Sequence, residues 1–87
     1  MLEEKDSNIK IVKLYIPLLN EGTPVLRPTT GMWLRGNIYK VLAVENYDPE
    51  DEEWRFPPES IVECRHELQN GEAVLVARKK VDLKPRG

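Results

Sequence analysis

The chain has 87 residues, and its 40% hydrophobic and 32% charged content is that of an ordinary globular protein. This length supports one domain, and a net charge of −2 argues against nucleic-acid binding through a generally basic surface. Cys64 is the one cysteine of the sequence, which excludes an internal disulfide and fits a reducing compartment.

The chain opens on an acidic, polar stretch that does not resemble a signal peptide, and no apolar run farther along is long enough to span a membrane. We therefore expect one cytoplasmic domain over residues 1–87, with frayed ends at 1–8 and 83–87. Seven prolines divide the chain into pieces that are too short for most helices. The pieces between them have strand character.

Residues 10–19 alternate in polarity, which predicts a half-buried strand. The inward face of this strand consists of Val12, Leu14, Ile16 and Leu18. Pro17 has no N–H group, so its end of the strand should lie at a sheet edge or a bulge. A turn at residues 20–23 and a short strand at residues 24–29, again with edge prolines, are predicted next.

A hairpin follows, with arms at residues 32–35 and 38–44. Its tip, Gly36-Asn37, fits a type II′ turn because the first central residue of that turn needs a positive φ. Both faces of residues 38–44 carry apolar side chains, which predicts a central strand.

The last two strands are predicted at residues 60–68 and 73–81, with a tight turn at Asn70-Gly71 between them. The side chains that should point inward from the first of these strands are Val62, Cys64, His66 and Leu68. Five to six short strands in antiparallel order predict an all-β fold. We expect a small, partly open β-barrel of SH3-like or OB-like size.

An acidic stretch separates the hairpin from the last two strands, with six acids between residues 45 and 53. Acids at Asp48, Glu50, Glu52 and Glu59 match part of the spacing of a calcium-binding EF-hand loop. Glu53 stands where that loop needs glycine, however, and Pro57-Pro58 would block the helix that should follow. We predict no metal site and no cofactor, while a weak, irregular cation site stays an alternative.

No catalytic set is recognisable in the sequence. Cys64 and His66 share a predicted strand face, but their side chains would lie about 6–7 Å apart, too far for a direct hydrogen bond. The glycines are scattered and form no phosphate-binding loop. We therefore predict that the protein is not an enzyme.

Trp54 and Phe56 alternate around Arg55, which places both rings on one face of an extended segment. Two interpretations stay open for them. The rings can plug one end of a small core, because aromatic side chains dominate core burial. Alternatively, they line a groove together with Trp33, Tyr39 or Tyr47, and such a groove suits a proline-rich or basic peptide.

Arg27 projects from the predicted short strand, where it can pair with Glu52 or Glu53 or recognise an anion. The candidate partner-binding residues are therefore Trp54, Phe56, Arg27, Glu52, Glu53 and Tyr47. The alternative function is a nucleic-acid-binding small barrel, for which the best available surface residues are Arg27, Arg35, Tyr39 and Lys40. The low content of basic residues makes nucleic acid the weaker of the two partners.

Two phrases of the chain, "YIPLLNEGTPVLRP" and "DPEDEEWRFPPESIV", resemble those of a set of short bacterial proteins of unknown function. Those proteins carry a PLLxEGTxVxRP phrase, a DPEDExWxFPP phrase and a final VLVA strand. The resemblance implies a bacterial, cytoplasmic origin. It also suggests that the acidic and aromatic segment has a role beyond that of a connecting loop.

We interpret the sequence as a non-catalytic protein-binding or peptide-binding module that uses its acidic and aromatic loop. A small regulatory or immunity-type partner is one concrete version of this hypothesis. We expect a monomer or a weak dimer, because exposed edge strands can pair between chains.

Overall fold

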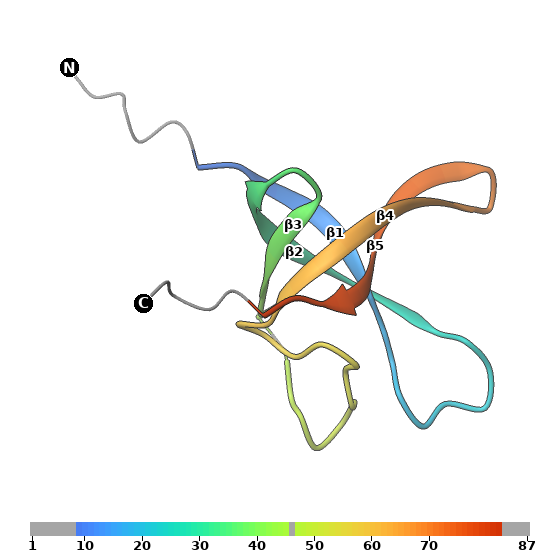
Figure 1. The fold of residues 1–87 in the computed structure, drawn as a ribbon. Helices are drawn as coiled ribbons and strands as arrows, with labels where there is room; N and C mark the ends of the chain where they lie inside the picture. The colour runs from blue at the N-terminus through green and yellow to red at the C-terminus, as the bar shows by residue number, and fades with distance from the viewer. Residues whose placement is uncertain (1–8, 46, 83–87) are drawn as a thin grey trace.

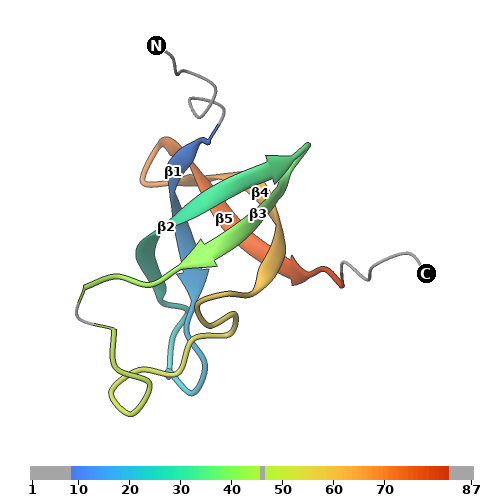
Figure 2. The same ribbon diagram turned by 90° about the vertical axis from the view of Figure 1, so that its left-hand side faces the viewer.

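The computed structural model describes residues 9–45 and 47–82, so the predicted frayed ends lie outside the described residues. Within these ranges the fold is all-β and consists of five strands (Figure 1, Figure 2). The strands are β1 Ile11–Pro17, β2 Leu26–Arg35, β3 Ile38–Leu42, β4 Ile61–Gln69 and β5 Glu72–Lys80. The prediction of a small β-barrel with five to six short strands is confirmed. None of the described residues belongs to a helix that is long and apolar enough to cross a membrane.

The strands form a closed ring in chain order, β1-β2-β3-β4-β5. Each strand pairs antiparallel with the next along the chain. In a meander with an odd number of strands the first and last strands run in the same direction, so β1 and β5 meet in parallel. Their pairing consists of a single position, Tyr15 opposite Val76. The ring is therefore closed where we expected it to be partly open, and this one position closes it.

The core fills the barrel with small and medium apolar side chains. Leu14 and Ile16 of β1 are fully buried, as the alternating pattern of residues 10–19 predicts. The other side chains with at most 1% exposure are Val41, Val62, Cys64, Val76 and Ala77. Burial of each branched side chain contributes about 1.5–3 kcal/mol, so this set supplies a large share of the stability of the domain.

Strand β2 is one continuous strand where the sequence analysis placed two short pieces, and that division was wrong. Gly31 lies at the break that we inferred, in the middle of β2 and buried. A Cβ atom on this residue would overlap Leu14 Cδ2 and lie 3.3 Å from the Lys40 carbonyl oxygen. The glycine therefore allows β2 to pass close to a core side chain and does not end the strand. Pro28 lies in the part of β2 that extends past the end of β3. Its missing N–H group therefore removes no hydrogen bond to β3.

The two predicted hairpin turns are present. Gly36 has φ +51° and Asn37 has a negative φ, as a type II′ turn requires, while Asn70 and Gly71 both have positive φ values of 54° and 84°. Strand β3 pairs only with the first residues of β4, so the β4–β5 hairpin extends beyond the barrel (Figure 1). We call residues 66–75 of this hairpin the arm. Leu68 lies on the arm and is 74% exposed, so the prediction that it points into the core was wrong.

Candidate functional site

The acidic loop, residues 45–59, is anchored to the barrel by its aromatic residues. Trp54 and Phe56 are 4% and 5% exposed and belong to the core, which confirms the interpretation of both rings as core plugs. The backbone around Trp54 also pairs with the chain that leaves β1. Leu19 N–H donates to the Glu53 carbonyl oxygen at 2.8 Å, and Arg55 N–H donates to that of Pro17 at 2.9 Å. The loop segment thus covers the end of β1 where Pro17 ends the strand.

The far end of the acidic loop is fixed to β3. Glu59 N–H donates to the Val41 carbonyl oxygen and Val41 N–H donates to that of Ser60, both at 2.8 Å. Glu59 has a φ of +81°, and its carboxylate lies 3.0 Å from Lys40 Nζ. The loop is therefore bonded to the barrel at residues 53–55 and again at Glu59, which limits how far its second half can move.

An ion pair joins the acidic loop to β2. Arg27 Nε donates to Glu52 Oε1 at 3.0 Å and Arg27 Nη2 donates to Glu52 Oε2, so the contact is bidentate. The predicted pairing of Arg27 with Glu52 or Glu53 is confirmed for Glu52. Trp54 Nε1 also donates to Glu52 Oε1 at 3.0 Å, while Glu53 accepts a hydrogen bond from Asn20. The hydrogen bond from Arg27 is the main reason why the pKa of Glu52 lies below its usual value.

A hollow of about 390 Å³ opens between β2 and the acidic loop. Its lining consists of Arg27, Pro28, Val44, Tyr47, Asp48, Asp51 and Glu52. The ring of Tyr47 meets that of Trp54 edge to face, with centroids 4.7 Å apart, so the wall of the hollow packs directly on the core.

The structure brings some of the predicted partner-binding residues together and separates others. Arg27, Tyr47 and Glu52 line the hollow, and Trp54 lies behind them in the core. Trp33 does not reach this site, because its indole N–H donates to the carbonyl oxygen of Gly36 at the tip of the β2–β3 hairpin. Two basic residues of the predicted nucleic-acid surface already have carboxylate partners: Arg27 pairs with Glu52, and Lys40 pairs with Glu59.

The tip of the acidic loop presents carboxylates to solvent. Asp48 organises the turn: its side chain accepts the Glu50 N–H at 2.9 Å, and its carbonyl oxygen accepts the Asp51 N–H at 3.0 Å. Glu45, Asp48, Glu50 and Asp51 are exposed, and in the described part of the chain none of them has an ion-pair partner. We call these four residues the free carboxylates. Residues 9–45 and 47–82 contain no group of three metal-ligating side chains that could hold an ion.

Cys64 and His66 do not form a nucleophile and base pair. Cys64 is 1% exposed, and burial raises the pKa of its thiol to about 12. The thiol therefore stays protonated near neutral pH and is a poor nucleophile. His66 is exposed on the arm.

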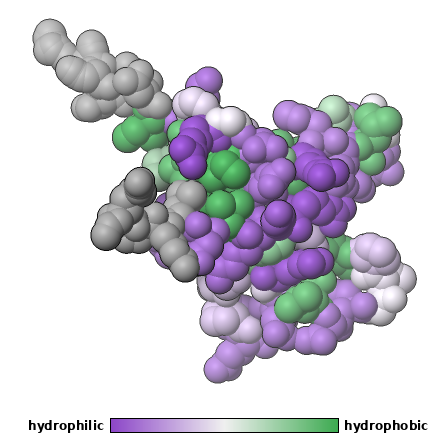
Figure 3. Space-filling model, viewed as in Figure 1, coloured by the Kyte–Doolittle hydropathy of each residue, from purple (hydrophilic) through white to green (hydrophobic). Residues whose placement is uncertain are grey.

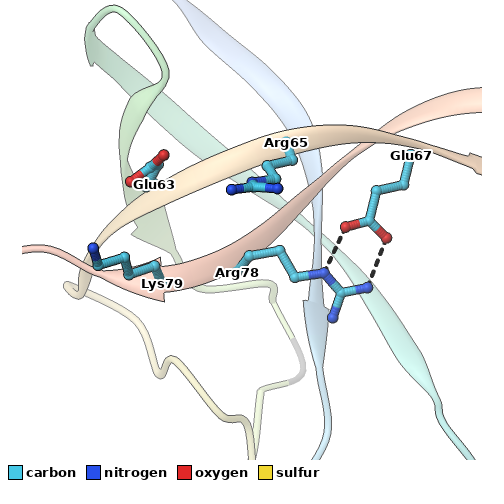
Figure 4. Close-up of a pocket in the computed structure, with 5 residues that line it drawn as sticks. All are labelled: Glu63, Arg65, Glu67, Arg78 and Lys79. Atoms are coloured by element: carbon cyan, nitrogen blue, oxygen red, sulfur yellow. Dashed lines mark hydrogen bonds and ion pairs between the residues drawn. The ribbon is translucent and has the colours of Figure 1, made fainter.

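A second cluster of charged side chains, which the sequence analysis did not identify, lies on the outer face of β4 and β5. It lines a hollow of about 470 Å³ with Glu63, Arg65, Glu67, Arg78 and Lys79 (Figure 4). A β-bulge assembles it: Glu63 pairs with Lys79 and Cys64 with Ala77, so Arg78 is an extra residue on β5. Arg78 makes a bidentate contact to Glu67 with two distances of 2.6 Å. Because a bulge depends on the register between two strands, alternation within either strand does not reveal it.

On the face of the molecule seen in Figure 3, hydrophobic side chains form small islands in a mostly hydrophilic surface. Comparison of the chain with known protein families, with curated proteins and with solved structures gives no match. The functional interpretation therefore depends on the geometry of the chain itself.

Proposed function

We propose that this protein is a non-catalytic binding module whose acidic loop receives a basic segment of a partner protein. The observation that carries this proposal is the set of free carboxylates on a loop whose second half is bonded to the barrel. Four negative charges on one loop attract a cationic partner.

The anchoring of the loop favours binding. A segment that is already ordered loses little conformational entropy when a partner docks, so more of the interaction free energy appears as affinity. Here Trp54 and Phe56 fix the loop from inside, and the Arg27–Glu52 pair fixes it from the side. The exposed acids are thus displayed by a scaffold that exists before the partner arrives.

The lining of the adjacent hollow indicates which basic segment fits. Tyr47 lines the hollow together with Asp48 and Asp51, and Pro28 and Val44 supply apolar surface. A lysine or arginine side chain can pack its aliphatic stem on this surface, approach the tyrosine ring and pair with a carboxylate. The preferred partner is therefore a lysine-rich or arginine-rich segment that also carries apolar side chains.

The experiment is capture of partners from an extract of the source cells on the immobilised protein. The test variant is the triple substitution Asp48→Asn, Glu50→Gln and Asp51→Asn, which removes three charges and keeps an acceptor at the turn. The matched control neutralises three exposed or half-exposed acids elsewhere, with Glu21→Gln, Glu63→Gln and Asp82→Asn.

The proposal predicts a protein that is retained by the wild type and the control, lost on the loop variant and released by salt, because salt screens exposed charges. Retention of the same proteins by the loop variant, or of none by the wild type, would contradict it. Retention of nucleic acid on the control and the loop variant alike would favour the nucleic-acid alternative.

A further inference from the structure

The barrel has a seam between β1 and β5 that pairs at only one position. Residues 11–14 of β1 pair with β2, and residues 72–75 of β5 pair with β4. On the sides that face each other, the two strands are joined only at Tyr15 and Val76 among the described residues. Beyond that pair the arm leans away from β1 (Figure 1). Two strand edges are thus left without a neighbour, at the opposite end of the barrel from the acidic loop.

The seam contains a hollow of about 430 Å³. It is lined by Val12, Lys13, Tyr15, Tyr39, His66, Glu72, Ala73, Val74 and Leu75. Tyr39 and Leu75 pack against the core beneath it and give it an apolar floor, while Lys13, His66 and Glu72 supply polar groups to its lining. Apolar floor between two unpaired strand edges is the surface that an extended peptide requires.

We propose that the seam binds an extended segment of a partner protein, which enters the barrel as a further strand between β1 and β5. Because β1 and β5 run parallel, a strand antiparallel to both would form an antiparallel ladder on each side. The side chains of such a strand alternate between the two faces of the sheet. Every second side chain therefore points to the floor of the seam and is apolar.

The charged residues that line the seam indicate which side chains the bound segment carries at its other positions, those that point away from the floor. Lys13 lines the seam, and no carboxylate of residues 9–45 or 47–82 lies within ion-pair distance of its ammonium group. Lys10, farther along β1, is likewise without a carboxylate partner in the described part of the chain. Lys13 already lies over the Tyr15 ring, and Glu72 lines the arm side of the seam. An acidic side chain of the bound segment therefore finds a partner in Lys13 only where it lies next to β1. The expected ligand is thus a strand of alternating apolar and acidic residues.

The test uses a blocked synthetic peptide of about six residues that alternates valine with glutamate, a length that spans the unpaired edges at about 3.3 Å per residue. It is added to the isotope-labelled full chain, and amide chemical shifts are followed up to about 1 mM peptide. Two further peptides serve as controls. One carries prolines in place of alternate residues and so lacks ladder N–H groups, and the other carries lysine in place of glutamate.

Two protein variants localise the binding. Ala73→Trp fills the seam from an exposed position on the arm, and Lys13→Glu reverses the charge beside β1. Lys79→Glu is the matched control, since Lys79 lines the hollow on the outer face of β4 and β5.

We expect saturable shifts at residues 11–15 and 72–76 with the valine and glutamate peptide, and an affinity lower by at least about tenfold for either seam variant. The proline and lysine peptides should not bind, and Lys79→Glu should bind as the wild type does. Absence of saturable shifts overturns the proposal, as does equal binding of the proline peptide. Shifts at the seam residues that depend on protein concentration alone would point to a second copy of this chain and contradict it. The acidic-loop proposal is unaffected by these outcomes, because it concerns the other end of the barrel.

Discussion

Replacement of Trp54 by alanine tests whether the acidic loop is part of the core. The ring is 4% exposed, packs edge to face on Tyr47 and bonds to Glu52 through its indole N–H. Truncation of a buried tryptophan costs about 3–5 kcal/mol, from lost burial and from the cavity that is left. A chain of 87 residues has a total stability of about 4–13 kcal/mol. Trp54→Ala should therefore remove a large part of the free energy of unfolding.

The matched control is Trp33→Ala. Trp33 is 37% exposed, lies outside the buried core cluster and donates its indole N–H to the Gly36 carbonyl oxygen, so its removal should cost less than that of Trp54, about 1–2 kcal/mol. Urea and thermal denaturation, both followed by circular dichroism, measure the free energy of unfolding and the Tm of each variant. With about 4–8 °C for each kcal/mol, Trp54→Ala should lower Tm by at least about 12 °C. Equal costs for the two tryptophans would refute the role of Trp54 as a core anchor.

Three further predictions concern the barrel and the loop. Gly31→Ala should cost about 1–3 kcal/mol through overlap with Leu14, whereas Gly22→Ala, with no atom within 4 Å of the added Cβ, should stay within about 0.5 kcal/mol of the wild type in the same urea titration. Cys64, with a pKa of about 12, should react with iodoacetamide at pH 8 at least about a hundredfold more slowly in the folded protein than in denaturant, and similar rates would contradict its burial. Because the pKa of Glu52 is lower in the folded protein than its ordinary value of 4.5, the charged carboxylate stabilises the fold above pH 4.5. This stabilisation is lost as the pH falls through the pKa of Glu52 in the folded protein. The difference in free energy of unfolding between the wild type and Glu52→Gln should therefore narrow below pH 4.5.

Several parts of the fold were readable from local patterns. The alternation of residues 10–19 gives the burial of Leu14 and Ile16, because side chains of a strand point to opposite faces in turn. The turn at Asn70-Gly71 is equally local, since both residues tolerate the positive φ values that a tight hairpin needs. The pair of Arg27 with Glu52 followed from opposite charges on segments that a small barrel brings together.

Other features depend on contacts that are not local. Gly31 reads as a break between strands until Leu14 is known to lie against it. Leu68 fits the inward face of its strand, yet β3 ends before it can cover that part of β4. The seam between β1 and β5 depends on how far each strand extends past its neighbours, which the sequence of either strand does not contain.

The central claim is that the free carboxylates bind a basic partner segment. Calorimetric titration of the captured partner into the wild type and into the Asp48→Asn, Glu50→Gln, Asp51→Asn variant, at about 0.01 M and 0.15 M salt, tests it most directly. The account predicts that the wild type binds at least about tenfold more tightly than the variant at low salt, and that this difference shrinks at the higher salt concentration. Equal affinity of the two proteins at both salt concentrations would contradict it.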